Sequence, residues 1–180
     1  MADREGTRRT LRSDAERNRD RLVEAARAAF RELGADAPMK SIATRAGVGT
    51  ATLYRRFPTR DDLLAYVFAD RLTGCADSVR AALRHPDPWQ GLVDHLAHLV
   101  ALQREDRAFT AVFLRARDEA ETPLGRLLDA AKAAGEVRQD ADESDVLLLL
   151  KAHDGVLRWT AEPEEESRRL VDCFLRYLRA

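Results

Sequence analysis

Apolar residues recur at helical spacing along almost the whole chain of 180 residues, and no segment shows the apolar–polar alternation of a half-buried strand. Alanine, leucine, arginine and glutamate dominate the composition, and all four favour helix. The sequence therefore predicts an all-α fold. The expected helices cover residues 13–33, 39–46, 50–57, 60–84, 89–104, 107–118, 123–134, 143–159 and 164–179.

Breaks and capping signals divide this helical pattern. Residues 1–12 are polar and rich in arginine, so we expect a flexible basic arm. Ser13 and Glu16 have the spacing of a capping box, which predicts that the first helix begins there. The clearest break is the segment 85–88, which contains two prolines. We expect a front domain over residues 13–60, a connecting helix over 61–84 and a helical back domain over 85–180.

Charge is distributed unevenly, although the net charge is only −1. Residues 1–60 carry 14 basic and 8 acidic side chains, whereas residues 61–180 carry 16 basic and 23 acidic ones. A basic front joined to an acidic back indicates a polyanionic partner at the front only. The amino terminus has no apolar stretch of a signal peptide, and the longest apolar run, Val146–Leu150, is too short to cross a bilayer. These features predict a cytoplasmic protein.

The segment 38–57 has the layout of a helix-turn-helix. Ala43 is small where two helices must cross closely, and Gly47 can take the left-handed backbone of a sharp turn. The wedge expected to hold the two helices at their angle consists of Ile42, Ala46, Val48 and Leu53. With Leu53 pointing inward, helical geometry turns Ala51 and Arg55 to the opposite side, flanked by Thr52 and Tyr54.

Such a surface suits the major groove of DNA. An arginine can bond guanine with two hydrogen bonds, a threonine methyl can meet a thymine methyl, and a tyrosine hydroxyl can hold a phosphate. The helix start at Gly49 and Thr50 offers free backbone donors to a phosphate. Arg45 suits a DNA contact and a solvated surface charge equally well.

The same segment resembles the tetracycline-repressor (TetR) family. The resemblance covers about residues 17–68 and is carried by Ile42-Ala43, Ala46-Gly47-Val48, Thr52-Leu53-Tyr54, Phe57 and Arg60-Asp61-Asp62-Leu63-Leu64, preceded by Ala25-Ala26, Phe30 and Gly34. The family often has lysine where Arg60 stands and glutamate where Asp61 stands, and it commonly has serine near Gly49, so the base preference of a relative cannot be transferred.

The resemblance implies a dimer that places two recognition helices in successive major grooves of a palindromic operator in double-stranded DNA. By analogy, Thr50, Ala51, Thr52 and Arg55 would face bases. Lys40, Ser41, Tyr54, Arg56 and Arg60 would hold phosphates. The resemblance further implies that a small-molecule effector binds the back half, and that its binding moves the connecting helix and releases the repressor from DNA.

The back half has no strong motif of its own. The family resemblance implies a homodimer formed by the last two helices, and the wide apolar stripes at residues 146–150 and 170–178 agree with this, although ordinary monomer core would produce the same stripes. The candidate residues for an effector pocket are Trp89, Phe109, Phe113, Arg117, His153 and Trp159, and each of them suits core or surface packing as well.

Other chemistries are poorly supported by the sequence. His95 and His98 share one helix face, but no third metal ligand is evident, and Cys75 and Cys173 suit packing better than a redox switch. Phosphate-binding loops, nucleophile elbows and zinc-protease motifs are absent from the sequence, so we expect neither catalysis nor a cofactor. The open alternatives are an activator, a regulator without a ligand, and a helical ligand-binding protein that no longer binds DNA.

Overall fold

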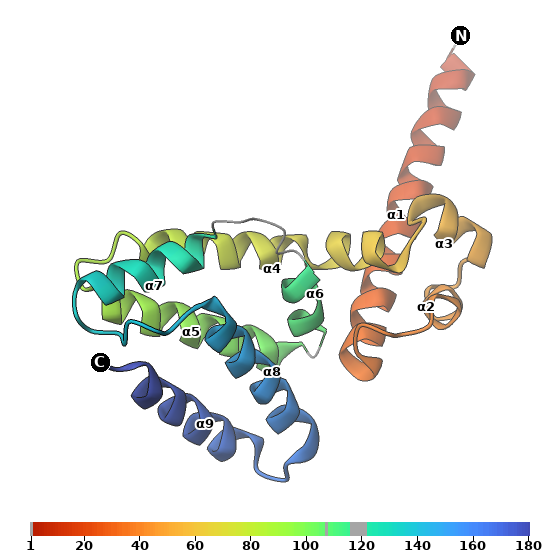
Figure 1. Ribbon diagram of the computed structural model, residues 1–180. Coiled ribbons are helices and arrows are strands. Elements are labelled where there is room, and N and C mark those ends of the chain that lie inside the picture. Colours follow the sequence, from red (N-terminus) through yellow and green to blue (C-terminus); the bar gives the residue numbers. More distant parts are fainter. Residues whose placement is uncertain (1, 107, 116–121) are drawn as a thin grey trace. The chain divides into compact units, whose positions relative to one another are not determined.

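The computed structural model describes residues 2–106, 108–115 and 122–180, and all regular structure within these ranges is helical (Figure 1). One isolated bridge pairs Val137 with Arg179. The helices are α1 (Ala2–Leu33), α2 (Met39–Ala46), α3 (Thr50–Arg56), α4 (Arg60–Ala82), α5 (Pro88–Glu105), α6 (Phe109–Arg115), α7 (Pro123–Ala133), α8 (Glu143–Trp159) and α9 (Pro163–Leu178). The all-α prediction is confirmed.

The first helix departs from its predicted bounds. It begins at Ala2 instead of Ser13, so the segment predicted as a basic arm, residues 1–12, falls largely within α1. The alanine, glutamate, leucine and arginine residues of this segment are helix formers, and they let the helix continue upstream of the capping signature. The side chains of Ser13 and Glu16 lie outside the described residues, as do the predicted ends of the helix over 107–118.

Capping explains where other helices begin. The Asp62 carboxylate accepts from the Thr59 backbone N–H (2.9 Å), and the Asp62 backbone N–H donates to the Thr59 hydroxyl (3.1 Å), which fixes the start of α4. Asp142 and Asp145 form the same reciprocal pair at the start of α8. Both pairs have the spacing of a capping box in the sequence.

The chain divides into two compact units, residues 1–68 and 69–180. In the first unit, α1 packs against α2, and α2 against α3. The largest buried side chains there come from all four helices: Phe30, Ile42, Leu53, Leu63, Leu64 and Phe68. The rings of Phe30 and Phe68 lie 6.3 Å apart, so the start of α4 belongs to this core.

In the second unit, α5 packs against α6, α7 and α8, and α9 packs against α8. Leu92, Leu96 and Leu99 form a fully buried stripe on α5. A Cβ atom at Gly91 would lie 2.6 Å from the Ala82 carbonyl oxygen, so only glycine permits this close approach of α5 to the end of α4. Among the described helices, none is both long and apolar enough for a membrane span.

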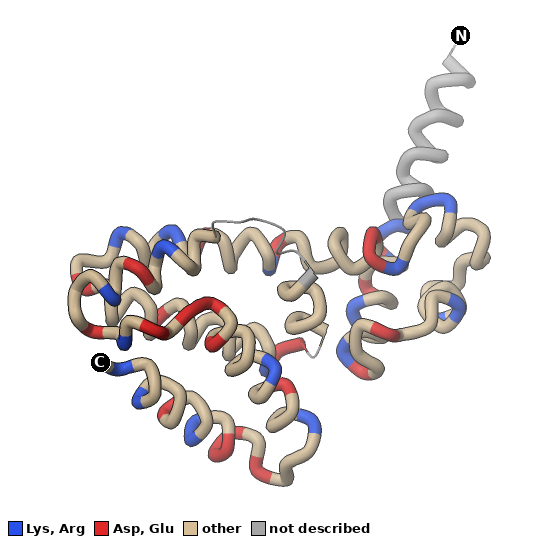
Figure 2. The backbone as a smooth tube through the Cα atoms, in the orientation of Figure 1, with Lys and Arg blue, Asp and Glu red and all other residues tan. Residues whose placement is uncertain are grey.

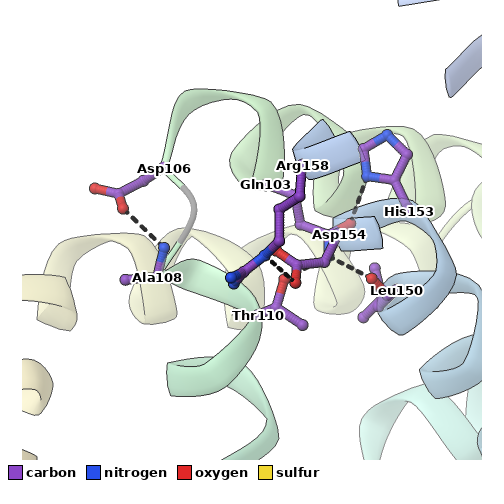
Figure 3. Close-up of polar contacts among 8 residues, drawn as sticks. All are labelled: Gln103, Asp106, Ala108, Thr110, Leu150, His153, Asp154 and Arg158. Atoms are coloured by element: carbon purple, nitrogen blue, oxygen red, sulfur yellow. Dashed lines mark hydrogen bonds and ion pairs between the residues drawn. The ribbon is translucent and has the colours of Figure 1, made fainter. Parts of the chain in front are cut away.

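A buried polar network joins four helices of the second unit, and Figure 3 shows its members on α5, α6 and α8. Gln103 Nε2 donates to the Thr110 hydroxyl (2.6 Å) and to the Leu150 carbonyl (2.8 Å), and its Oε1 accepts from His153 Nδ1 (2.9 Å). His153 Nδ1 therefore carries the proton, and the Ser167 hydroxyl donates to the other ring nitrogen, Nε2 (2.6 Å). The network attaches α8 and α9 to α5 and α6.

The turn between α2 and α3 requires a left-handed residue. Gly47 has φ +66° and its backbone N–H donates to the Thr44 carbonyl, while the Val48 N–H donates to the Ala43 carbonyl. The space beside Gly47 is open, so the backbone conformation, and not crowding, explains the glycine.

Gly47→Ala should lower the free energy of unfolding by about 1 kcal/mol, because alanine is strained in the left-handed region. Gly74→Ala is the matched control, since a Cβ there also meets open space but the residue lies inside α4 at ordinary helical φ. The control should be neutral or stabilising by about 0.5–1 kcal/mol. Urea unfolding measures both, and equal effects of the two substitutions would contradict this explanation.

Candidate DNA-binding surface and ligand cavity

The α2–turn–α3 unit rests on a buried wedge, as predicted. Ile42 and Leu53 are fully buried, Ala43 and Ala46 are nearly so, and Val48 is half-buried. Pro38 precedes α2 with extended backbone, and Gly49 does the same for α3. The wedge fixes the face that α3 turns away from the core of the unit.

That outer face of α3 carries the residues expected to read DNA. Thr50, Ala51, Thr52, Tyr54, Arg55 and Arg56 are all exposed, while Leu53 alone is buried within the helix. The Arg55 guanidinium donates to the Thr52 hydroxyl (3.0 Å). Because two neighbouring polar side chains are already joined, the arginine is held along the helix face and does not extend freely into solvent.

Helices α2 and α3 contain basic residues and no acidic ones, as Figure 2 shows in blue. Lys40 and Ser41 on α2 are exposed, as is Gly49 before α3. Carboxylates hold Arg45 and Arg60: Arg45 forms a two-bonded ion pair with Glu32 (3.0 and 2.6 Å), and Arg60 pairs with Asp36 at 3.3 Å.

The Arg45 ion pair affects both partners. Its hydrogen bonds lower the pKa of Glu32 and raise the pKa of Arg45. Both groups are on the surface, so the pair contributes little to stability, and its carboxylate reduces the positive charge that Arg45 offers to a polyanion. Lys40, Arg55 and Arg56 are therefore the stronger cationic candidates in this unit.

A hollow of about 500 Å³ lies beside the end of α3, lined by Thr52, Arg55, Arg56, Phe57 and Tyr66. The rings of Phe57 and Tyr66 lie 5.3 Å apart, and Phe57 is buried while Tyr66 is 46% exposed. The hollow thus has an aromatic wall formed by Phe57, at the end of α3, and Tyr66 of α4, and a cationic wall from α3. Tyr66 is not among the residues that the sequence predicts for this surface.

The second unit contains an apolar cavity of about 280 Å³ along α4. Four residues on one face of α4 line it, spaced at helical intervals: Leu72, Cys75, Ala76 and Val79. The described residues that complete the lining come from α5, α6 and the start of α7: His95, Phe113, Thr122, Pro123 and Leu124.

His95 is the main polar group of this lining, and it is 2% exposed. Its Nδ1 lies 3.1 Å from the Ser78 hydroxyl of α4. Burial, and secondarily the neighbouring His98, lowers the pKa of His95 to about 4, so the ring is neutral at pH 7. Burial raises the pKa of the Cys75 thiol to about 12, which makes it an inert neutral group.

Most of the residues predicted from sequence for a pocket lie elsewhere, and among those that the structure describes only Phe113 lines the cavity. Phe109 is fully buried and stacks on Phe113 at 5.7 Å, and His153 belongs to the buried network. The ring of Trp89 is covered by the Arg179 guanidinium at 4.1 Å, and Trp159 is 87% exposed at the end of α8. Arg117 lies outside the described residues.

The cavity residues on α4 gave no signal in the sequence, because the apolar stripe of a connecting helix has the same pattern whether it lines a cavity or a core. His95 was considered only as a metal ligand beside His98. No group of three metal-binding side chains occurs within the described ranges, and Cys173 is exposed whereas Cys75 is buried.

Lowering the pH from about 6.5 to 4 should destabilise the protein through His95. In that window the unfolded chain takes up a proton on this residue that the folded chain does not, so the free energy of unfolding falls, by an amount on the order of 3 kcal/mol. Burial lowers the pKa of His153 as well, which adds in the same direction. Urea unfolding of wild type and His95→Gln across this pH range measures the difference, and an equal loss of stability in both proteins would refute this assignment.

Comparisons with known proteins match both units. Residues 22–67 match the family model described as bacterial regulatory proteins, tetR family, and residues 79–180 match the C-terminal domain of SbtR-like transcriptional regulators. An HTH-type transcriptional regulator of Staphylococcus aureus is 43% identical over 58 residues, which are 32% of this chain and 31% of that protein. The match therefore spans about a third of the length of this curated relative.

Solved structures extend the likeness to most of the chain. A TetR transcriptional regulator from Streptomyces coelicolor is 30% identical, covering 89% of this chain and 98% of its own, with a TM-score of 0.52. A ketosteroid transcriptional regulator of Mycobacterium tuberculosis, 17% identical with a TM-score of 0.59 over 90% of this chain and 95% of its own, shares the fold.

These matches confirm the resemblance found in the helix-turn-helix and extend it through the helical back half. The chain belongs to the tetR family of bacterial regulatory proteins and is a transcriptional regulator of that family.

Proposed function

We propose that the protein is a homodimeric repressor that binds a palindromic DNA operator through α2 and α3 and leaves it when a small molecule fills the cavity beside α4. The observation that carries this proposal is the exposed face of α3, where hydroxyls and arginines surround a single buried anchor, Leu53. The protein would act in the cytoplasm, where its DNA operator is located.

On DNA, the exposed face of α3 enters the major groove. Thr50, Ala51, Thr52 and Arg55 contact bases, with Arg55 bonded to a guanine and oriented by the Thr52 hydroxyl that it contacts at 3.0 Å. The phosphate contacts come from Lys40, Ser41, Gly49, Tyr54, Arg56 and Arg60. Arg60 must then exchange or share its Asp36 partner, which is itself exposed.

The dimer forms through α8 and α9. Helix α9 buries only Ser167 and Leu178, leaving most of its apolar stripe partly open, and Leu148 of α8 is 65% exposed. Unpartnered apolar side chains on two adjacent helices support a four-helix contact between two subunits. The buried network through Gln103 and His153 supports the same role, because it holds both helices firmly on the subunit.

Release follows from differential binding. Helix α4 contributes Leu63, Leu64, Val67 and Phe68 to the core of the first unit, and its later turns line the cavity. A ligand that binds more tightly when α4 is in a position incompatible with the operator shifts the population away from DNA. An activator or a ligand-independent regulator shares the same DNA surface. Loss of the gene would lower target transcripts for an activator and raise them for a repressor.

Selection of random duplex DNA by the purified protein tests the proposal. We expect a palindromic consensus whose affinity falls steeply with salt, because phosphate contacts release counterions. Arg55→Ala should cost about 1–3 kcal/mol in each of two half-sites, a loss of roughly 30-fold or more, and should relax the preference at one base pair.

Arg84→Ala is the control, because it removes one exposed positive charge from the second unit. It should retain the consensus and nearly all the affinity. Recovery of no consensus at low or high salt would overturn DNA reading and favour a helical ligand-binding protein, and equal losses in the two variants would reduce Arg55 to a nonspecific charge.

Leu148→Arg should dissociate the dimer, since the substitution places a charge twice in a symmetric apolar contact. Loss of the favourable free energy of burying two leucine side chains, about 3–6 kcal/mol, would raise the dimer dissociation constant by roughly 100-fold or more. Sedimentation equilibrium measures the change. Leu33→Arg, at a leucine that is 57% exposed at the end of α1, serves as control and should remain dimeric. A dimeric Leu148→Arg would rule out α8 as the interface.

A further inference from the structure

The size of the cavity limits its occupant. An engineered protein cavity of about 150 Å³ holds benzene, which has six non-hydrogen atoms. The cavity along α4 measures about 280 Å³, so by the same proportion it holds roughly eleven such atoms. This corresponds to one substituted aromatic ring, a two-ring system or a short branched chain, and it excludes molecules of three or more fused rings unless the site opens.

The lining selects against charge. Leu72, Ala76, Val79, Phe113, Pro123 and Leu124 are apolar, and none of the lining residues that the structure describes carries a charge at pH 7. An ionised ligand would lose its hydration there without gaining a counter-ion, which is among the most unfavourable transfers in a protein interior. The described part of the lining therefore disfavours an anionic or cationic occupant.

Thr122 and His95 are the hydrogen-bonding side chains of the described lining, and they differ in the capacity that they have left for a ligand: Thr122 keeps one acceptor lone pair, whereas His95 keeps a whole ring nitrogen. The Thr122 hydroxyl donates to the Glu143 carboxylate and accepts from the Gly125 backbone N–H (3.1 Å). His95 uses Nδ1 for Ser78, and its Nε2 has no hydrogen-bond partner among the described residues. His95 is a lining residue of the cavity, so this ring nitrogen is open to a hydrogen bond from a ligand there.

Ser78 can donate to Nδ1 or accept from it, so Nε2 is either a donor or an acceptor. A hydroxyl group satisfies both cases, because it donates and accepts, whereas an ether or a carbonyl only accepts. The hydroxyl is thus the functional group that matches this position regardless of the His95 tautomer.

We propose that the cavity binds an uncharged, mostly apolar alcohol or phenol of about ten to twelve non-hydrogen atoms, with its hydroxyl bonded to His95 Nε2. This inference rests on the proposed function, in which the same cavity holds the effector. It goes further by naming the chemical class of the effector and the residue that selects it.

Three probes of matched shape test the class by calorimetry at neutral pH: 4-propylphenol, propylbenzene and 4-propylbenzoate. The phenol should bind about tenfold more tightly than propylbenzene, which lacks the hydroxyl. The benzoate should bind more weakly than either. If a variant fails to fold, the relative affinities of the three probes for the wild-type protein alone test the proposed class.

His95→Leu should remove the advantage of 4-propylphenol over propylbenzene, because the hydroxyl loses its partner. His98→Leu makes the same substitution one turn further along α5, at a residue outside the described lining, and should keep the tenfold advantage. A benzoate that binds best, three probes of equal affinity, or no binding by any probe would overturn the proposed class.

Fluorescence anisotropy of the selected operator duplex separates this inference from the proposed function. A benzoate that binds best and releases DNA would overturn the alcohol class and leave the effector role intact. A phenol that binds as expected but leaves DNA affinity unchanged would overturn the effector role and leave the class intact.

Discussion

One helix belongs to both halves of this chain, and the account of its function depends on that constraint. The apolar stripe of α4 begins with Leu63, Leu64, Val67 and Phe68, which are buried in the core of the first unit. The stripe continues at the same spacing through the residues that line the cavity. In the proposed mechanism, a ligand that displaces the later turns also acts on the turns that support the helix-turn-helix, because a helix is stiff over this length.

The two buried histidines of the second unit, His95 and His153, differ in their hydrogen bonds. Both ring nitrogens of His153 are engaged, by Gln103 and by Ser167, so this residue serves the packing of α5, α8 and α9. His95 is equally buried but engages only Ser78, and it lines the cavity. A polar group whose hydrogen bonds are all formed stabilises a fixed arrangement. A polar group that can form a further hydrogen bond favours the binding of a further molecule. This contrast distinguishes the structural histidine from the candidate ligand-binding one.

Local signals in the sequence predicted the fold well. The Thr59–Asp62 and Asp142–Asp145 caps, the left-handed Gly47 and the buried Leu53 all depend on residues a few positions apart, so they can be read from one segment. The start of α1 was missed because good helix formers upstream of Ser13 outweighed a capping signature.

The cavity could not be predicted in the same way. Its lining combines α4, α5, α6 and the start of α7, and the distance between them is set by tertiary packing. Aromatic residues were the natural candidates, yet Trp89 packs under Arg179 and Phe109 fills the core. The exposed face of α3 was easier to predict, because a short helix-turn-helix fixes its own outer face.

The central claim is that occupancy of the cavity and binding of DNA are coupled through α4. The most direct test is calorimetric titration of 4-propylphenol into the free protein and into the protein saturated with its selected operator duplex. The account predicts that DNA weakens binding of the phenol by the same factor by which the phenol weakens binding of DNA, since coupling between two sites is reciprocal. Equal affinity of the phenol for the free and the DNA-bound protein would contradict the account.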